Sequence, residues 1–298
     1  MLDSSRDTAA IALFIFNRPD LASKVMEAIA AVRPKVLMVV ADGSRSQEEA
    51  ELCKATRDIA IRNIDWPCEL VTNFSETNLG CRQRVSLGID WVFQNVEEAI
   101  ILEDDCLPHP DFFSFCTYLL DYYRDDQRVW TISGDNFQDG QIRGDGSYYF
   151  SRYPHTWGWA TWRRAWQHYD VNMTDWPLLR ESDCLESVFD SPEEALYWIS
   201  VWDHLYHHGI PNTWDYQWIY TCWKNNALTV LPNRNLVSNI GFRNDGTHCL
   251  SDDHPLANLP TYPIEEIQHP SFHLRDKIAD QYFAEKYLDI GSLTQLLS

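Results

Sequence analysis

Three acidic residues, Glu103, Asp104 and Asp105, follow directly after the apolar run AIIL at residues 99–102. The run predicts a strand that is buried on both faces, and ligands bind beyond the carboxyl ends of the strands in open parallel sheets. Three adjacent carboxylates repel one another and are costly to bury unpaired. Mn²⁺ or Mg²⁺ would relieve this cost, because both ions take oxygen ligands and add water and ligand phosphates. The alternative is a solvated strand end, or acids that cap the next helix.

Polar residues also follow the three other strands that the first 105 residues predict. They are Asn17 and Arg18 after the first strand, Asp42 and Gly43 after the second, and Gly80, Arg82 and Arg84 at a helix start after the third. A glycine turn, a helix N-terminus and arginines make an anion site. Each signal alone also fits a surface ion pair, but their convergence on one edge of the sheet favours a binding site.

The elements that must position these residues alternate between strand and helix. Strands are expected at 11–16, 35–43, 68–74 and 99–103, and helices at 18–32, 46–64, 81–96 and after Pro110. Continuously apolar strands that alternate with helices are typical of a parallel sheet covered on both faces. The sequence therefore predicts an α/β fold with a Rossmann-like, mostly parallel sheet flanked by helices.

After about residue 128 the pattern is less regular and rich in tryptophan. Strands are expected at 128–137, 147–152 and 227–242, and helices at 157–169, 191–209, 213–226 and 273–290. Trp159, Trp162 and Trp166 recur at helical spacing, which favours a helix packed in the core. Because no low-complexity linker separates the two parts, we expect one domain over 1–298, with a nucleotide-binding half at about 8–128 and an acceptor and sugar half at about 129–298.

The composition limits the partners. With 24 basic and 44 acidic residues the formal net charge is −20, which disfavours nucleic acid and anionic lipids as partners. The eight cysteines form no C-x-x-C pair, as expected for free thiols in a reducing compartment. The polar N-terminus does not read as a secretion signal, and no apolar run approaches the roughly 20 residues of a membrane span. A cytoplasmic location without a membrane span is therefore expected.

Six motifs carry a family resemblance: FNRPD, ADGS, CRQRVSLGIDWVF, LEDDCLPHPDFF, YPHTWGWATWRRAW and WDYQW, in this order from about residue 11 to 220. They resemble the GT-A nucleotide-sugar glycosyltransferases, in particular the group around the Golgi N-acetylglucosaminyltransferase that starts complex N-glycans and its bacterial relatives. The first four are fairly specific as an ordered set, and the last 70 residues match less clearly. The resemblance implies a GT-A fold and transfer of a hexosyl or N-acetylhexosaminyl group from a nucleoside-diphosphate sugar, with UDP as the expected nucleotide, to a glycan or lipid-linked acceptor.

The resemblance also implies roles for single residues. Arg18 and Asp42 would hold the uridine, with Asp42 facing the base, and Arg82 would lie near the nucleotide or its phosphates. The acids would form the family's D-x-D-like motif, in which Asp105 ligates Mn²⁺ or Mg²⁺. The other two acids, Glu103 and Asp104, would contact sugar or ribose hydroxyls.

Asp215 in WDYQW is the expected catalytic base. The family motif usually reads W-D-D-W, whereas here Tyr216 and Gln217 separate Asp215 from Trp218. A carboxylate that takes the proton of an acceptor hydroxyl, on the face opposite the leaving group, gives inversion at the anomeric carbon. The alternative is a helix N-cap formed by Thr213 or Asp215.

Two further segments are candidates for contact with the donor. Trp157 and Gly158 are the first two residues of the segment 157–169, ahead of its helically spaced tryptophans, and could border the donor sugar, since Gly158 permits close backbone approach. The glycine-containing segment 239–249 could fold over the diphosphate, with His248 as a metal or phosphate ligand. A lone histidine is more often structural.

Three other classes of protein are alternatives to a glycosyltransferase. A non-catalytic protein on the same fold would bind a nucleotide sugar or glycan without turnover, and a hydrolase would use water as the acceptor. A dinucleotide oxidoreductase is disfavoured, because no G-x-G-x-x-G follows the first strand.

Overall fold

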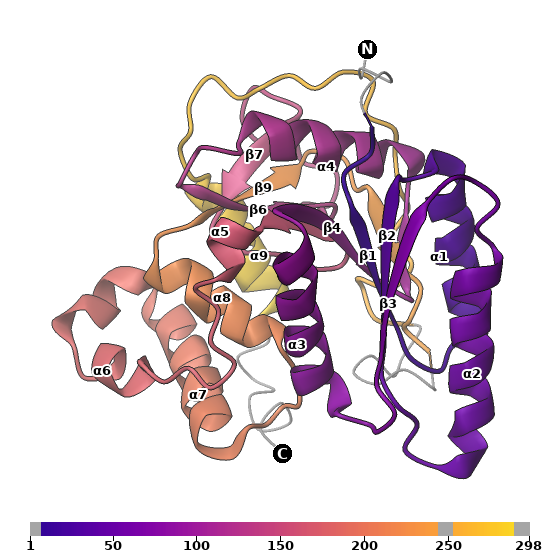
Figure 1. Ribbon diagram of the computed structural model, residues 1–298. Helices are drawn as coiled ribbons and strands as arrows, with labels where there is room; N and C mark the ends of the chain where they lie inside the picture. The colour runs from indigo at the N-terminus through magenta and orange to yellow at the C-terminus, as the bar shows by residue number, and fades with distance from the viewer. Residues whose placement is uncertain (1–6, 244–252, 289–298) are drawn as a thin grey trace.

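The computed structural model describes residues 7–243 and 253–288 and is built around a large central sheet (Figure 1). The strands of this sheet are β1 (Ile11–Ile15), β2 (Val36–Ala41), β3 (Glu69–Phe74), β4 (Glu98–Glu103), β6 (Val129–Ser133), β7 (Tyr148–Ser151), β8 (Trp159–Trp162) and β9 (Leu228–Pro232). They lie side by side in the order β3-β2-β1-β4-β8-β6-β9-β7. A second, two-stranded sheet pairs β5 (Cys106–Pro108) with β10 (Val237–Asn239).

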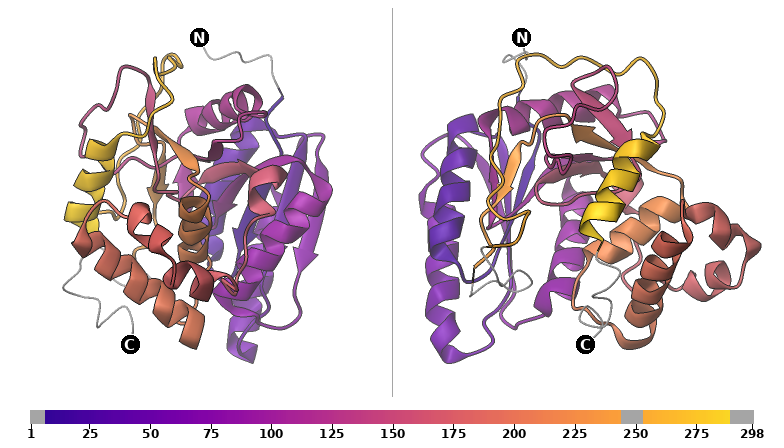
Figure 2. Two further views of the ribbon diagram at one scale, coloured as in Figure 1. Left: turned by 90° about the vertical axis from the view of Figure 1, so that its left-hand side faces the viewer. Right: turned by 180° about the vertical axis from the view of Figure 1, so that it is seen from behind.

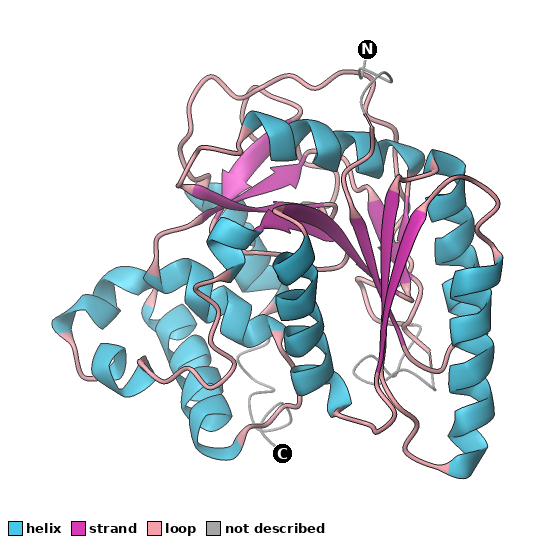
Figure 3. Ribbon diagram, viewed as in Figure 1, coloured by secondary structure: helices cyan, strands magenta, loops and turns pink. Residues whose placement is uncertain are grey.

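Helices cover both faces of the central sheet (Figure 3). They are α1 (Pro19–Val32), α2 (Gln47–Arg62), α3 (Gly80–Asn95), α4 (Pro110–Tyr122), α5 (Arg163–Trp166), α6 (Trp176–Arg180), α7 (Pro192–His208), α8 (Asp215–Lys224) and α9 (Lys277–Tyr287), with a 3₁₀ helix, η1, at Asp183–Val188. The apolar faces of α1 and α4 share one core, and those of α3, α7 and α8 share the other. Among the described residues no helix has the length and apolar character that a membrane crossing requires.

The side chains of β1 show how the sheet separates these two cores. Ile11, Leu13 and Ile15 pack on the side of α1, whereas Ala12 and Phe14 pack on the side of α3. All five residues are buried, because successive side chains of a strand point to opposite faces. This two-sided burial explains why the strand reads as a continuous apolar run.

Strands from both parts of the chain belong to the same sheet. The pairs β3-β2, β2-β1, β1-β4 and β6-β9 are parallel, whereas β4-β8, β8-β6 and β9-β7 are antiparallel. The predicted α/β class, with a mostly parallel sheet flanked by helices, is confirmed. Helix α9 lies against the second part of the chain, on the side away from α1 and α2 (Figure 2).

The expectation of one helix over 157–169 is wrong. Trp159–Trp162 forms β8, between β4 and β6, and only the four residues of α5 that follow are helical. Trp159 packs into the core on the side of α3, and Trp162 packs into the core on the side of α4. Three tryptophans at helical spacing could not reveal this, because hydrogen bonds to strands on both sides override local periodicity.

Candidate active site

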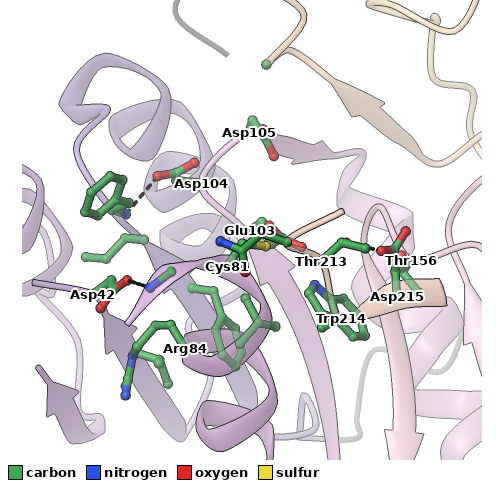
Figure 4. A pocket seen from close by; sticks show the side chains of 18 of the residues that line it. Asp42, Cys81, Arg84, Glu103, Asp104, Asp105, Thr156, Thr213, Trp214 and Asp215 are labelled. Atoms are coloured by element: carbon green, nitrogen blue, oxygen red, sulfur yellow. Dashed lines mark hydrogen bonds between the residues drawn. The ribbon is translucent and has the colours of Figure 1, made fainter. Parts of the chain in front are cut away.

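A cavity of about 510 Å³ opens beyond the carboxyl ends of β1, β2 and β4 (Figure 4). Its wall comes from the residues after these strands, the start of α3, the segment before β8 and the segment that leads into α8. The lining residues used below are Phe16, Arg18, Asp42, Arg45, Asn78, Gly80, Cys81, Arg84, Glu103, Asp104, Asp105, Trp157, Asn212, Thr213, Asp215 and Gly241. The fold therefore brings together strand ends that lie far apart in the sequence.

Nine of the candidate binding and catalytic residues line this cavity, and four do not. Those that line it are Arg18, Asp42, Gly80, Arg84, Glu103, Asp104, Asp105, Trp157 and Asp215. The four that do not line it are Asn17, Gly43, Arg82 and Gly158, and His248 lies outside the described residues.

Arg18 forms ion pairs with two of the three acids that end β4. Its Nη2 contacts Asp104 Oδ1, and its Nη1 lies 3.0 Å from Asp105 Oδ2. Asp104 also accepts a hydrogen bond of 3.0 Å from the backbone N–H of Phe16 and is 2% exposed. Burial raises the pKa of Asp104 to about 6, and the positive charge of Arg18 opposes this rise. Asp104 therefore ties β4 to the end of β1.

Glu103 has a different environment from its neighbours. Its side chain lies in the middle of the cavity (Figure 4), and no hydrogen bond or ion pair within the described part of the chain engages its carboxyl group. Burial, followed by the charges of Asp105 and Asp104, raises the pKa of Glu103 to about 8. An unpaired carboxyl group in a cavity is available to a ligand hydroxyl or to a cation.

The Asp42 carboxylate lines the cavity but is occupied by internal donors. It accepts hydrogen bonds from the backbone N–H groups of Leu79 at 2.9 Å and Gly80 at 3.0 Å, and from Asn78 Nδ2 at 3.1 Å. The backbone N–H of Gly43 adds a fourth donor at 2.9 Å. These bonds satisfy N–H groups at the start of α3, where a negative charge is favourable. Asp42 therefore fixes α3 at the cavity, and its predicted contact with a base stays a prediction.

The segment that carries Asp215 is anchored by aromatic side chains. Trp214 stacks on Trp159 with ring centroids 5.5 Å apart, and Tyr169 donates a hydrogen bond of 3.0 Å to the Trp214 carbonyl oxygen. The Thr213 hydroxyl donates to the Asp215 carboxylate. Asp215 is the first residue of α8, and neither side chain caps this helix. The N-cap alternative is therefore not what the structure shows.

Three residues that the sequence did not identify as candidates also lie in the wall of the cavity or support it. Asp135 is buried, and its Oδ2 accepts the backbone N–H of Trp157 at 3.0 Å, which holds the segment before β8 in place. Burial raises the pKa of Asp135 well above its usual range. Cys81 and Arg45 both line the cavity, and burial raises the pKa of the Cys81 thiol, with Glu103 adding to this rise. Cys81 directly follows Gly80, and Arg45 lies two residues after Gly43. Their position close to a glycine between a strand and a helix was the signal in the sequence.

Asn17 and Arg82 make contacts beside the cavity. Asn17 Nδ2 donates to Glu49 Oε1 at 2.7 Å. Arg82 Nη2 donates to the Val171 carbonyl oxygen at 2.6 Å. Both side chains therefore support neighbouring segments, and the donor contacts expected for them stay predictions.

The acids at the end of β4 carry the kind of ligand atoms that the implied divalent cation would need. Carboxylate oxygens of Glu103 and Asp105 are the donors that Mg²⁺ and Mn²⁺ prefer. Yet the described residues assemble no group of three or more His, Cys, Asp or Glu side chains that could hold a metal. A cation at this site would therefore take one or two oxygens from the described residues and complete its shell with water and phosphate.

Comparison with known proteins finds no matching family model and no matching curated protein. Among solved structures, the chain is similar to a UDP-glucose pyrophosphorylase complexed with UDP-glucose, at 11% identity and a TM-score of 0.32 over 54% of this chain and 79% of that chain. HddC from Yersinia pseudotuberculosis matches at 9% identity and a TM-score of 0.32, over 53% and 80%. A glycosyltransferase involved in the glycosylation of the major capsid of PBCV-1 matches at 12% identity and a TM-score of 0.28, over 68% and 78%. At these TM-scores the similarity carries no argument about the activity of this chain.

Proposed function

We propose that this protein is an inverting glycosyltransferase that moves a sugar from a nucleoside-diphosphate donor, with UDP as the expected nucleotide, to a hydroxyl group of a glycan or lipid-linked acceptor. The observation that carries the proposal is one cavity in which an arginine–carboxylate cluster and a separate, oriented carboxylate face the same space. The first group suits a departing diphosphate, and the second suits a proton acceptor.

The departing diphosphate gains negative charge as the sugar–phosphate bond breaks, and it needs positive charge close by. Arg18 supplies one guanidinium at this point of the cavity. Asp105 and Glu103 would hold Mn²⁺ or Mg²⁺, which supplies the remaining positive charge. Asp104 keeps Arg18 and the end of β4 in register by its bond to the backbone of Phe16.

The acceptor hydroxyl needs a base, because its own pKa is far above neutral. Asp215 is the proposed base. The Thr213 hydroxyl occupies one of its oxygens and thereby orients the other. Attack on the face of the sugar opposite the diphosphate inverts the configuration at the anomeric carbon.

The first experiment tests donor and cation together. UDP-, GDP- and dTDP-sugars are added to the protein with Mn²⁺ or with a chelator, and the unfolding temperature is measured. We expect donors of one nucleotide to raise it, because a ligand that binds only the folded state stabilises it, and the chelator to abolish this rise. Absence of a shift with every donor, or a Mn²⁺-independent shift that persists in Asp105→Ala, would contradict the proposal.

The second experiment tests the base and separates an enzyme from a non-catalytic binding protein. Asp215→Asn should lower turnover by about 10²- to 10⁴-fold and leave the Kd of the donor nearly unchanged, because only proton transfer is lost. Glu193→Gln, an exposed acid in the first turn of α7, is the matched control and should turn over like the parent. Unaltered turnover in Asp215→Asn rejects the base. A parent protein that binds donor but shows no turnover with any acceptor supports the non-catalytic alternative.

A further inference from the structure

The order of the strands indicates how a bound donor would lie along the cavity. Asp42 and Arg45 follow β2, and Phe16 and Arg18 follow β1. The three acids lie at the end of β4, and the strands are neighbours in the order β2-β1-β4. Asp42 and Asp215 lie on opposite sides of Glu103 (Figure 4). If the diphosphate lies at the acids and the sugar points to Asp215, the nucleoside must extend toward the end of β2.

We propose that the nucleobase of the donor stacks on the guanidinium of Arg45, which lies over the ring of Phe16, and that Glu49 is the residue that positions Arg45. This inference rests on the proposed function, since it needs a nucleotide donor. It gives a role to Phe16, the first residue of the FNRPD motif, and adds Arg45, which lies outside the six motifs.

The Arg45 guanidinium is layered over the Phe16 ring, and both groups border the cavity. Arg45 Cζ lies 5.1 Å from the centroid of this ring. The Arg45 side chain is 59% exposed, which leaves its guanidinium accessible. Bases stack on aromatic rings and on arginine planes with little dependence on sequence.

Glu49 holds the guanidinium in this position. Its Oε1 lies 3.0 Å from Arg45 Nε, its carboxylate also contacts Arg45 Nη2, and its Oε2 accepts the Arg45 backbone N–H at 2.6 Å. Only 11% of the Glu49 side chain is exposed, and Asn17 donates a further hydrogen bond to it. An arginine that is already held in place loses less conformational entropy when a ligand binds. Asn17 therefore acts on the nucleotide indirectly, through Glu49 and Arg45.

The test compares two ligands that differ in the nucleoside. The Kd of inorganic pyrophosphate and the Kd of the nucleoside diphosphate that stabilises the parent (UDP, GDP or dTDP) are measured by calorimetry with Mn²⁺. Arg45→Ala should weaken nucleotide binding about tenfold, the upper range for one cation–π contact and a stacked base, and pyrophosphate binding less than about twofold. Arg45→Lys keeps the charge but loses the plane and the two-pronged contact with Glu49, so it should also weaken nucleotide binding selectively. Glu49→Gln should do so to a smaller extent.

Arg62→Ala is the matched control. Arg62 ends α2, pairs with Asp58 and is 76% exposed, so its removal changes the net charge equally without touching the cavity. If Arg45→Ala raises the Kd of both ligands by the same factor, or if Arg45→Lys keeps the nucleotide Kd of the parent, then Arg45 acts by charge alone. Either result would overturn the proposal. A parent protein that binds pyrophosphate but none of the three nucleotides would instead overturn the proposed function.

Discussion

Consecutive side chains at the end of β4 have separate environments although their chemistry is the same. Asp104 accepts the backbone N–H of Phe16 and also contacts Arg18, Asp105 contacts Arg18, and Glu103 faces the cavity. Gly241 allows Asp105 to lie where it does, because a Cβ at this glycine would meet Asp105 Oδ2 at 2.2 Å. Three adjacent acids can therefore divide into one structural anchor and two groups that a ligand can reach.

Glu103 should make the ligand-free protein less stable as the pH rises. Its pKa is about 8 in the folded protein, whereas an unfolded chain has a glutamate pKa of about 4.3. The folded state therefore binds the proton more tightly, and the free energy of unfolding falls as the pH rises between these two values. Asp104, with a pKa raised to about 6, adds to the lower part of this decline.

Glu103→Gln tests this pH dependence, because the amide cannot ionise. In urea unfolding with chelator present, the variant should be more stable than the parent at about pH 8.5 and nearly equal to it at about pH 4.5. Glu265→Gln, at an exposed position, should stay within about 0.5 kcal/mol of the parent at both pH values. A variant that is less stable than the parent at the higher pH would show that the charged carboxylate stabilises the empty protein.

At the scale of elements, the cavity depends on how α3 begins. Asp42 binds its first N–H groups, and Gly80, with φ of +77°, lets Asn212 approach to 2.8 Å from where a Cβ would stand. Gly43 lies against the backbone of Thr77, at 2.4 Å from the position of a Cβ. These close approaches join the end of β2, the start of α3 and the segment that leads to Asp215.

Asp42→Asn should destabilise the protein even without a nucleotide. An amide nitrogen would then face N–H donors, and we expect the free energy of unfolding to fall by about 2 kcal/mol. Asp58→Asn, on α2 at a partly exposed ion pair with Arg62, should change it by less than about 0.5 kcal/mol. Urea unfolding in the absence of ligand measures both. If Asp42→Asn unfolds like the parent and loses only nucleotide binding, the carboxylate serves the ligand and not the helix.

At the scale of the whole molecule, ion pairs attach α9 to the rest of the second half. Arg275, just before α9, contacts Asp280 in the helix and Asp190, which precedes α7. Arg152, next to β7, contacts Glu194 in α7 and lies 3.3 Å from Asp190. Asp280 is 2% exposed, and burial raises its pKa, with Arg275 opposing the rise. One edge of the sheet, α7 and α9 therefore depend on a shared network.

Arg275→Met should lower the free energy of unfolding by about 3 kcal/mol, because it leaves the buried Asp280 carboxylate without its ion-pair partner. Lys277→Met is the matched control: its ammonium lies 3.0 Å from the same Asp190 but is 62% exposed, so the loss should be less than about 1 kcal/mol. Urea unfolding gives both values, and hydrogen exchange in α9 shows whether the helix is released. Equal losses in the two variants would contradict a special role for Arg275.

The sequence by itself determined the alternation of strands and helices in the first part of the chain. It also placed the acids at the end of β4 and the polar residues after β1 and β2. These conclusions hold because burial on both faces gives each central strand an apolar run, and because parallel strands end at one edge of the sheet.

Only the tertiary structure decided which groups these residues meet. The Asp42 carboxylate accepts hydrogen bonds from N–H groups at the start of α3. Arg18 forms an ion pair with Asp104 at the end of β4, and Asn17 donates a hydrogen bond to Glu49. It likewise made Trp159–Trp162 a strand, because β4 and β6 offer hydrogen bonds on both sides. Each of these contacts joins segments far apart in the chain, where local periodicity carries no information about the partner of a buried polar group.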